Sequence, residues 1–216
     1  VGIVHRPGFA DQTAYAGAAA IKILDFFEEY YGIDYPGSKL DLIAVPDFAM
    51  GAMENVGAVT FRETLLLIDV EKATRSELSR SISVIAHELA HMWFGDLVTM
   101  NWWDGIWLNE AFASLMEVIA SEATYPEFKL WNEMNQDRSR GFGVDSLKSS
   151  RPVEFEVKSP EEAEEMFDVL TYQKGSTVLR MFETFIGEES FKEGVRNYLN
   201  KYEYKNTHSS DLWNEL

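Results

Sequence analysis

Apolar positions follow two different periods along the chain. Residues 10–31 carry large apolar side chains at helical spacing and are followed by Gly32, a typical C-cap, so they predict a helix. Proline, glycine and charged residues divide the next stretch into short apolar runs, which predict the strands of a small sheet: residues 40–45, 57–61 and 65–68. We therefore expect a sheet-containing lobe over about residues 1–73.

From about residue 74 the apolar pattern becomes helical. Thr74 and Glu77 form a capping-box sequence, and the apolar positions after them recur at steps of three and four up to about Phe94. A tryptophan-rich loop then leads into a second helix, whose apolar stripe is Leu108, Phe112, Leu115 and Ile119. Later helices are predicted at about 126–140, 161–186 and 188–202. The expected fold class is α+β, with a mainly helical lobe over about residues 74–216.

The composition is that of a globular protein, with 46% apolar residues and only six prolines. The chain has no cysteine, which excludes disulfides, thiolate catalysis and cysteine-ligated zinc. No apolar run is long enough for a membrane span, and the first residues do not form a signal peptide. These features slightly favour the cytoplasm but do not determine the compartment.

The charge balance is strongly acidic, with 36 Asp and Glu against 19 Lys and Arg and a formal net charge of −17. Such a field repels nucleic acid and anionic membrane surfaces, so we expect neither as a partner. Cationic ligands fit this charge better, although an acidic surface also simply keeps a protein soluble.

Two histidines lie four residues apart within the predicted helix that follows Thr74. On a helix, His87 and His91 share one face and can direct ring nitrogens at a single metal ion. Glu88 lies one step round the helix, where a carboxylate could act as a base beside that ion. The alternative is a pair of ordinary helical histidines, and this short pattern does not exclude it.

A catalytic zinc ion needs a third protein ligand and keeps one open position for water. The candidate is Glu110, which has eighteen residues between it and His91 and lies near the start of the second predicted helix. Small neighbours such as Ala111 and Ser114 would let the two helices approach closely. The alternative for Glu110 is a first-turn glutamate that only complements the helix dipole.

Several motifs match one family in the same order along the chain. Residues 87–91, His-Glu-Leu-Ala-His, together with Glu110, resemble the gluzincin peptidases, specifically the M1 zinc aminopeptidases. Five residues match the exopeptidase motif of that family: Gly51, Ala52, Met53, Glu54 and Asn55. Residues 167–168 and 172–175 resemble the segment that carries the family's catalytic tyrosine, and residues 93–99 also follow its pattern. The similarity spans the whole chain.

The resemblance implies a thermolysin-like catalytic domain with one zinc ion per chain in a cleft between the two lobes. It implies that zinc is held by His87, His91 and Glu110. It also implies flanking domains in the full-length protein, an N-terminal β domain and a C-terminal helical domain. On that basis we expect the isolated 216 residues to be weakly active or inactive even with zinc bound.

The resemblance further implies roles for the remaining motif residues. Glu88 would be the general base that takes a proton from a zinc-activated water, and Tyr172 would donate a hydrogen bond in the transition state. Glu54 would bind the free amine of a peptide substrate, a contact that only the first residue of a chain can make. Without the resemblance, a glutamate such as Glu54 is more often a solvated loop acid, and Tyr172 is only one of nine tyrosines. The backbone at Gly51 and Ala52 suits an edge that pairs with an extended peptide.

Two other functions remain open at this point. Relatives that hydrolyse lipid epoxides tend to have glycine where this chain has Ala52, and non-catalytic scaffolds of the family have lost zinc ligands that this chain retains. Three further acids lie near the motifs in sequence and are candidates to orient the ligand histidines: Asp96, Asp104 and Glu117. The side chain preferred at the first position of a substrate cannot be predicted from the sequence.

Overall fold

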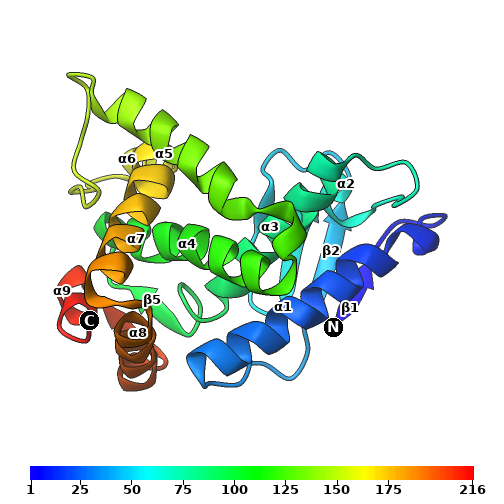
Figure 1. Cartoon of the computed structure of the whole chain (residues 1–216), viewed down its shortest axis with the longest axis horizontal. Helices are drawn as coiled ribbons and strands as arrows, with labels where there is room; N and C mark the ends of the chain where they lie inside the picture. Colours follow the sequence, from blue (N-terminus) through cyan, green and yellow to red (C-terminus); the bar gives the residue numbers. More distant parts are fainter.

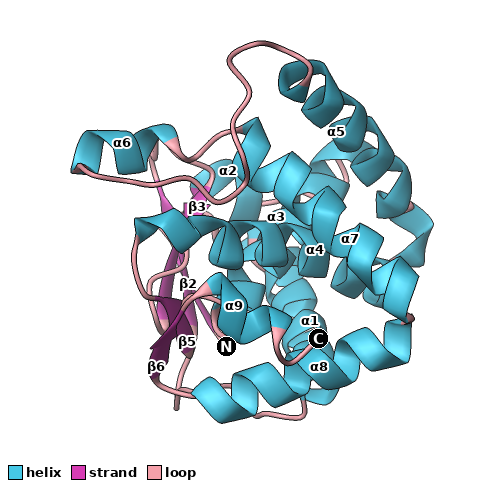
Figure 2. Cartoon of the chain, turned by 90° about the vertical axis from the view of Figure 1, so that its left-hand side faces the viewer, coloured by secondary structure: helices cyan, strands magenta, loops and turns pink.

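The computed structural model describes residues 1–216 and has a small mixed sheet along one side of a mostly helical molecule (Figure 2). The order of its strands is β1-β2-β4-β3, in which β1–β2 and β2–β4 are parallel and β3–β4 is antiparallel. A separate parallel pair, β5–β6, joins two distant segments. The strand bounds are β1 Gly2–Val4, β2 Asp41–Val45, β3 Ala52–Met53, β4 Ala58–Arg62, β5 Val98–Met100 and β6 Lys205–Thr207.

Helices make up the rest of the fold, with α3 and α4 side by side at its centre (Figure 1). The α-helices are α1 Ala14–Tyr31, α2 Glu63–Leu66, α3 Arg75–His91, α4 Ile106–Thr124, α5 Leu130–Asp145, α6 Pro160–Glu165, α7 Gly175–Ile186, α8 Glu188–Tyr202 and α9 Ser209–Trp213. Short 3-10 helices cover Ala10–Gln12, Trp103–Gly105 and Pro126–Phe128, and a π-helix, η4, covers Leu170–Lys174. None of the helices combines the length and the apolar character needed to cross a bilayer.

One hydrophobic core of 39 buried residues holds these layers together. It takes residues from α1 and the sheet as well as from α3, α4, α7 and α8, so it extends to both sides of residue 73. Aromatic pairs run through it: Phe94 stacks on Phe112 with ring centres 4.2 Å apart, and Tyr31 lies against Trp93 at 5.0 Å with the rings tilted by 45°. Close packing of this kind fixes the relative positions of α3 and α4.

Several sequence predictions are confirmed by the fold. Thr74 and Glu77 form the predicted capping box at the start of α3, with both reciprocal hydrogen bonds present. Gly32 ends α1 in the left-handed conformation, with φ of 67°, as its place after residues 10–31 predicted. The helix predicted over residues 188–202 has those bounds as α8.

The strand predicted over residues 65–68 is wrong. Leu65 and Leu66 belong to the short helix α2, and Leu67 and Ile68 follow it without regular structure. Three of the four residues are buried, so the run is apolar because it is enclosed rather than because it pairs in a sheet. A short apolar run has no period that distinguishes a strand from a helical turn, which explains the error.

The helix predicted over residues 161–186 is also wrong as a single element. It consists of α6, the π-helix η4 and α7, with a break over residues 166–169. Two other bounds shift, because α1 begins at Ala14 after a 3-10 turn and α5 runs from Leu130 to Asp145, beyond the predicted range 126–140. Gly141 and Gly143 lie within α5 rather than ending it, and Gly141 faces the backbone of Lys174 at close range.

Candidate metal centre and active site

Three side chains from α3 and α4 converge on one point inside the protein. His87 and His91 lie on successive turns of α3, and Glu110 lies in the first part of α4, the helix that packs along α3. His87 Nε2 is 3.2 Å from His91 Nε2 and 3.3 Å from Glu110 Oε2, and His91 Nε2 is 3.4 Å from the same oxygen. The three atoms therefore form a nearly equilateral triangle.

The size of this triangle fits a tetrahedral zinc site. Ligand atoms at 2.0–2.1 Å from zinc in tetrahedral geometry are about 3.3 Å apart, which agrees with the three observed separations. The side chains of His91 and Glu110 are only 1% and 7% exposed, so three electron-pair donors face one another with little water between them. Such an arrangement requires a positive charge at its centre.

The other ring nitrogen of each histidine has its own partner. His87 Nδ1 donates to Glu117 Oε2 at 3.2 Å, and His91 Nδ1 donates to the carbonyl oxygen of Phe94 at 2.9 Å. With Nδ1 protonated in this way, Nε2 of each ring is the atom with a free electron pair. Glu117 and the Phe94 carbonyl thus orient both imidazoles toward the centre of the triangle.

The ionisation of the three ligands reflects their mutual contact. Burial alone would lower the pKa of both histidines, yet hydrogen bonds to Glu110 and Glu117 raise the pKa of His87 well above its usual value, and Glu110 raises the pKa of His91 to about 9. Burial alone would raise the pKa of Glu110, but the two imidazoles hold it far below its usual range. The cluster therefore attracts positive charge, which a metal ion or protons can supply.

Glu88, the residue after His87 on α3, is a buried acid. It is 5% exposed, and its Oε2 has no hydrogen-bond partner in the protein. Burial raises the pKa of its carboxyl group to about 7, against the opposing charges of His87 and His91. A pKa near neutrality suits a group that must both accept and return a proton.

Tyr172 reaches the site from η4. Its ring lies nearly parallel to the imidazole of His87, with the ring centres 6.0 Å apart and an interplanar angle of 26°. Burial, followed by the charge of Glu110, raises the pKa of its phenol far above the usual value. The hydroxyl therefore keeps its proton and remains a hydrogen-bond donor at every physiological pH.

Glu54 lies beside His91 of the triangle, just after β3. Its Oε1 lies 3.9 Å from His91 Nδ1, and its side chain is 17% exposed. β3 pairs only with β4 and forms the edge of the sheet, so one side of its backbone is free to pair with another strand. Asn55 links the hairpin through its contact with Thr60 Oγ1 at 3.3 Å.

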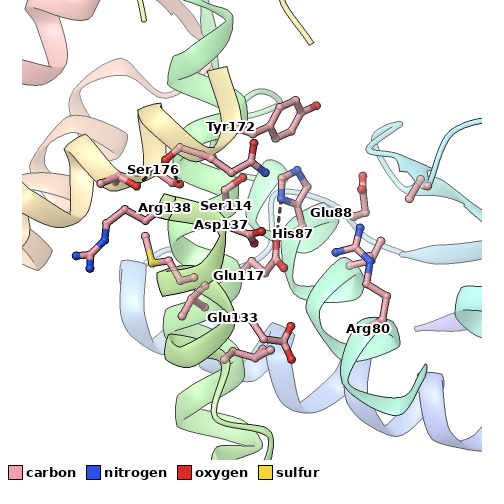
Figure 3. Close-up of a pocket in the computed structure, with 18 of the residues that line it drawn as sticks. Arg80, His87, Glu88, Ser114, Glu117, Glu133, Asp137, Arg138, Tyr172 and Ser176 are labelled. Atoms are coloured by element: carbon pink, nitrogen blue, oxygen red, sulfur yellow. Dashed lines mark hydrogen bonds and ion pairs between the residues drawn. The ribbon is translucent and has the colours of Figure 1, made fainter. Parts of the chain in front are cut away.

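A cavity of about 310 Å³ opens beside these groups (Figure 3). Its wall includes His87, Glu88 and Tyr172, and it also includes Gly51 and Ala52 from the sheet edge. In the close-up, Tyr172, His87 and Glu88 lie at one end of the cavity and Glu133 of α5 at the other. Glu54 and His91 are not part of the wall, so the cavity extends from the His87 side of the triangle.

Comparison with known proteins identifies the family. The family model described as the peptidase family M1 domain matches residues 15–216. The chain belongs to peptidase family M1. It is 49% identical to human endoplasmic reticulum aminopeptidase 2 over its whole length, and that match covers 22% of the human protein. It is 47% identical over 97% of its length to probable aminopeptidase 2 of Sulfurisphaera tokodaii, of which it covers 27%, and 44% identical over its whole length to aminopeptidase M1 of Arabidopsis thaliana, of which it covers 25%.

This M1 chain thus spans about a quarter of the length of the curated relatives that it matches. Its fold is mixed, mostly helical with a small sheet, as the α+β prediction stated.

Three acids were considered as partners of the ligand histidines. Glu117 contacts His87, whereas Asp104 instead accepts a hydrogen bond from the backbone amide of Val157 at 2.6 Å. Asp96 has a buried Oδ2 without a partner, and burial raises its pKa to about 7.

The remaining residues of the exopeptidase motif differ in their surroundings. Met53 is 45% exposed and lies outside the cavity wall, whereas Gly51 and Ala52 form part of it. The sequence did not reveal the Phe94 carbonyl as a partner of His91, because a backbone oxygen leaves no signal in residue type. Glu117 was one of three candidate acids, and its spacing could have favoured it over Asp96 and Asp104, since it lies seven residues after Glu110 and therefore on the same face of α4.

Proposed function

We propose that this M1 chain is the catalytic part of a zinc aminopeptidase, which hydrolyses the first peptide bond of peptides with a free amino terminus. The observation that carries the proposal is the position of Glu54, an acid beside the metal-ligand triangle at the end of an edge strand. A carboxylate at this place favours the ammonium group of a first residue over an internal peptide unit. The names of the relatives, all aminopeptidases, support the same function.

One zinc ion would be held by His87, His91 and Glu110, whose atoms have the separations of a tetrahedral set. When bound, zinc polarises the scissile carbonyl group and lowers the pKa of a water molecule. The protein orients the two imidazoles through Glu117 and the carbonyl oxygen of Phe94. These contacts keep the ligands in place before substrate binds.

The other groups act on the substrate and on protons. Glu88 takes a proton from the attacking water and returns it to the departing amine, and its buried Oε2, which has no hydrogen-bond partner in the protein, is available for this. Tyr172 donates a hydrogen bond to the carbonyl oxygen of the scissile bond as negative charge develops on it. The free edge of β3 pairs with the extended backbone, and Gly51 and Ala52 allow that close approach.

The direction of the substrate follows from the two sides of the triangle. The amino terminus of the substrate lies at Glu54, on the side of His91, and the part after the scissile bond enters the cavity on the side of His87.

We also propose the thermolysin-like arrangement, with a sheet lobe over residues 1–73 and a helical lobe over residues 74–216. The cavity wall supports it, because it combines Gly51 and Ala52 with residues of α3, α4 and α5.

The decisive experiment measures cleavage of aminoacyl anilides with a free amine and of their N-acetylated versions, using the whole zinc-loaded protein in which this chain occurs. We expect a preference of at least about 100-fold for the free amine, which Glu54→Gln reduces by about tenfold or more because the charge-assisted contact is lost. Glu63→Gln, a change of the same kind outside the cavity wall and the metal-ligand group, serves as the control. Equal cleavage of both substrate series would reject the aminopeptidase proposal.

A further inference from the structure

Tyr172 stands on an unusual element, which raises the question of what holds it there. It is the central residue of η4, a five-residue π-helix that leads directly into α7. A π-helical turn contains one residue more than an α-helical turn and is rare, because its hydrogen bonds and packing are less favourable. Contacts from outside the turn must therefore maintain it.

The first end of η4 is held by Asp168 and Arg151. Asp168 Oδ1 accepts hydrogen bonds from the backbone amides of Leu170 at 2.9 Å and Thr171 at 3.0 Å. The same oxygen accepts from Arg151 Nη2 at 2.6 Å, and this nitrogen also lies 3.0 Å from Thr171 Oγ1. The side chain of Arg151 is only 11% exposed, whereas that of Asp168 is 39% exposed.

The second end of η4 is held by Lys174. Its Nζ donates to Asp145 Oδ1 at 2.7 Å and to the backbone carbonyl oxygen of Arg151 at 2.9 Å. The next residue, Gly175, packs so tightly on α4 that an added Cβ would lie 2.6 Å from the Cβ of Ala111. The start of α7 therefore cannot move toward α4 to relieve the extra residue in the turn.

Arg151 contacts both ends of the π-helix. Its guanidinium group binds Asp168 and Thr171 before Tyr172, and its carbonyl oxygen binds Lys174 after it. It lies in the segment between α5 and α6, and none of the proposed site groups touches it. Arg151 therefore bonds on both sides of Tyr172, with its side chain before it and its backbone carbonyl oxygen after it.

We propose that Arg151 is a positioning residue for the reaction: through Asp168 and Thr171 it maintains the π-turn that directs the Tyr172 hydroxyl at the site. This inference rests on the proposed function, because it assumes that the phenol acts on the substrate. Arg151 itself touches neither substrate nor metal ligands. Displacement of a reacting group by about 1 Å costs about 100-fold in rate, so a loosened turn should lower turnover.

The experiment is a double-mutant cycle in the whole zinc-loaded protein, with Arg151→Met made alone and together with Tyr172→Phe. We expect Arg151→Met to lower kcat by about 10- to 100-fold, with KM changed by less than about twofold and zinc content unchanged. In the Tyr172→Phe background the same change should lower kcat by less than about twofold, since no hydroxyl remains to be positioned.

Conservative and control variants sharpen the cycle. Arg151→Lys keeps a charge for Asp168 but cannot also reach Thr171 with a planar group, so it should recover part of the lost kcat. Arg6→Met removes an exposed ion pair with Glu63, and because neither residue lines the cavity it should leave kcat unchanged. If Arg151→Met does not fold, Asp168→Asn replaces it, because the amide oxygen still accepts from the backbone while the charge that attracts Arg151 is lost.

The outcomes separate two kinds of failure. Equal losses of kcat with and without the Tyr172 hydroxyl would mean that Arg151 has a structural role only, and would overturn this inference while leaving the aminopeptidase proposal intact. A loss of less than about threefold in Tyr172→Phe alone would remove the phenol from the mechanism, and the inference with it. A loss confined to the background that retains the hydroxyl supports it.

Discussion

His87, His91 and Glu110 stand on two long regular helices, whereas Glu54 follows a strand of two residues and Tyr172 stands on a π-helix of five. The facing surfaces of α3 and α4 are almost completely buried, and the hydrophobic core fixes their positions. The elements that carry Glu54 and Tyr172, which the proposed function places toward the substrate, are here called the substrate-facing side. They depend instead on hydrogen bonds of individual side chains. Substitutions on the two sides should therefore have different effects. A change among the metal-ligand residues should release the metal, whereas a change at Glu54 or Tyr172 should lower turnover while the protein keeps its metal.

The largest effect is expected on the metal-ligand side. His91→Ala removes one of the three proposed ligands, so zinc affinity should fall by more than about 100-fold, the upper end of the loss caused by removing an outer partner. Activity should disappear with the metal. Inductively coupled plasma mass spectrometry after dialysis measures the zinc content, and His5→Ala, outside the site, is the control. A His91→Ala protein that retained one zinc per chain would contradict the assigned ligand set.

Glu88→Gln tests whether a substitution on α3, the helix of His87 and His91, can abolish turnover without loss of the metal. Turnover should fall by about 100- to 10,000-fold, because the amide cannot accept the proton, while zinc content stays near one per chain. Steady-state kinetics and metal analysis on the same sample decide the matter. Undiminished activity would remove Glu88 as the base, and loss of zinc would make it part of the metal site instead.

Tyr172→Phe tests the substrate-facing side. Loss of one hydrogen bond to developing charge should lower kcat by about 100- to 1,000-fold, with zinc affinity unchanged. The control is Tyr204→Phe, which removes a hydroxyl from a side chain that is 72% exposed. The contrast between the two sides would break down if Tyr172→Phe also released the metal.

The pH dependence of stability should differ between metal-free and zinc-loaded protein. The pKa of His91 is raised from 6.5 to about 9 in the folded protein, so its contribution to stability is complete below pH 6.5 and is lost as pH rises to about 9. At about 1.4 kcal/mol per pKa unit, the contribution of His91 to the stability of the metal-free protein should fall by about 3 kcal/mol across this range. Urea unfolding at pH 6.5 and 9.5 measures it, and a zinc-loaded protein with the same slope would argue against histidine ligation.

The smallest effect is expected at the outer partner of His87. Glu117→Gln keeps an acceptor for Nδ1 but removes its charge, so zinc affinity should fall by about 10- to 100-fold. Activity should return when zinc is raised in proportion, which a zinc titration of both proteins measures. A loss of kcat that persists at saturating zinc would place Glu117 on the substrate-facing side of the comparison.

The ligand helix was predictable because its signals are local. Thr74 and Glu77 mark its start, the apolar steps mark its buried face, and His87 and His91 share the other face by spacing alone. Glu110 required the assumption that α4 packs along α3, which the small residues beside it favoured. The family motif then supplied Glu54 and Tyr172, which no periodicity could have selected.

The substrate-facing elements were not predictable in the same way. Residues 161–186 have a continuous helical pattern, yet Arg151, distant in sequence, and Asp168 divide them and maintain a π-turn in between. Residues 65–68 lack any period at all. In both places the structure is set by contacts between segments far apart in sequence, which local propensity does not contain.

The unpaired edge of β3 affects which proteins such an enzyme would leave uncleaved. Pairing with an edge strand requires several extended residues with free amide and carbonyl groups. A folded protein whose first residues lie in a helix, or are already paired in its own sheet, cannot offer them. On the proposed function, the edge acts as a test of conformation before any test of sequence, so peptides and frayed chain ends would be trimmed while neighbouring folded proteins stay intact.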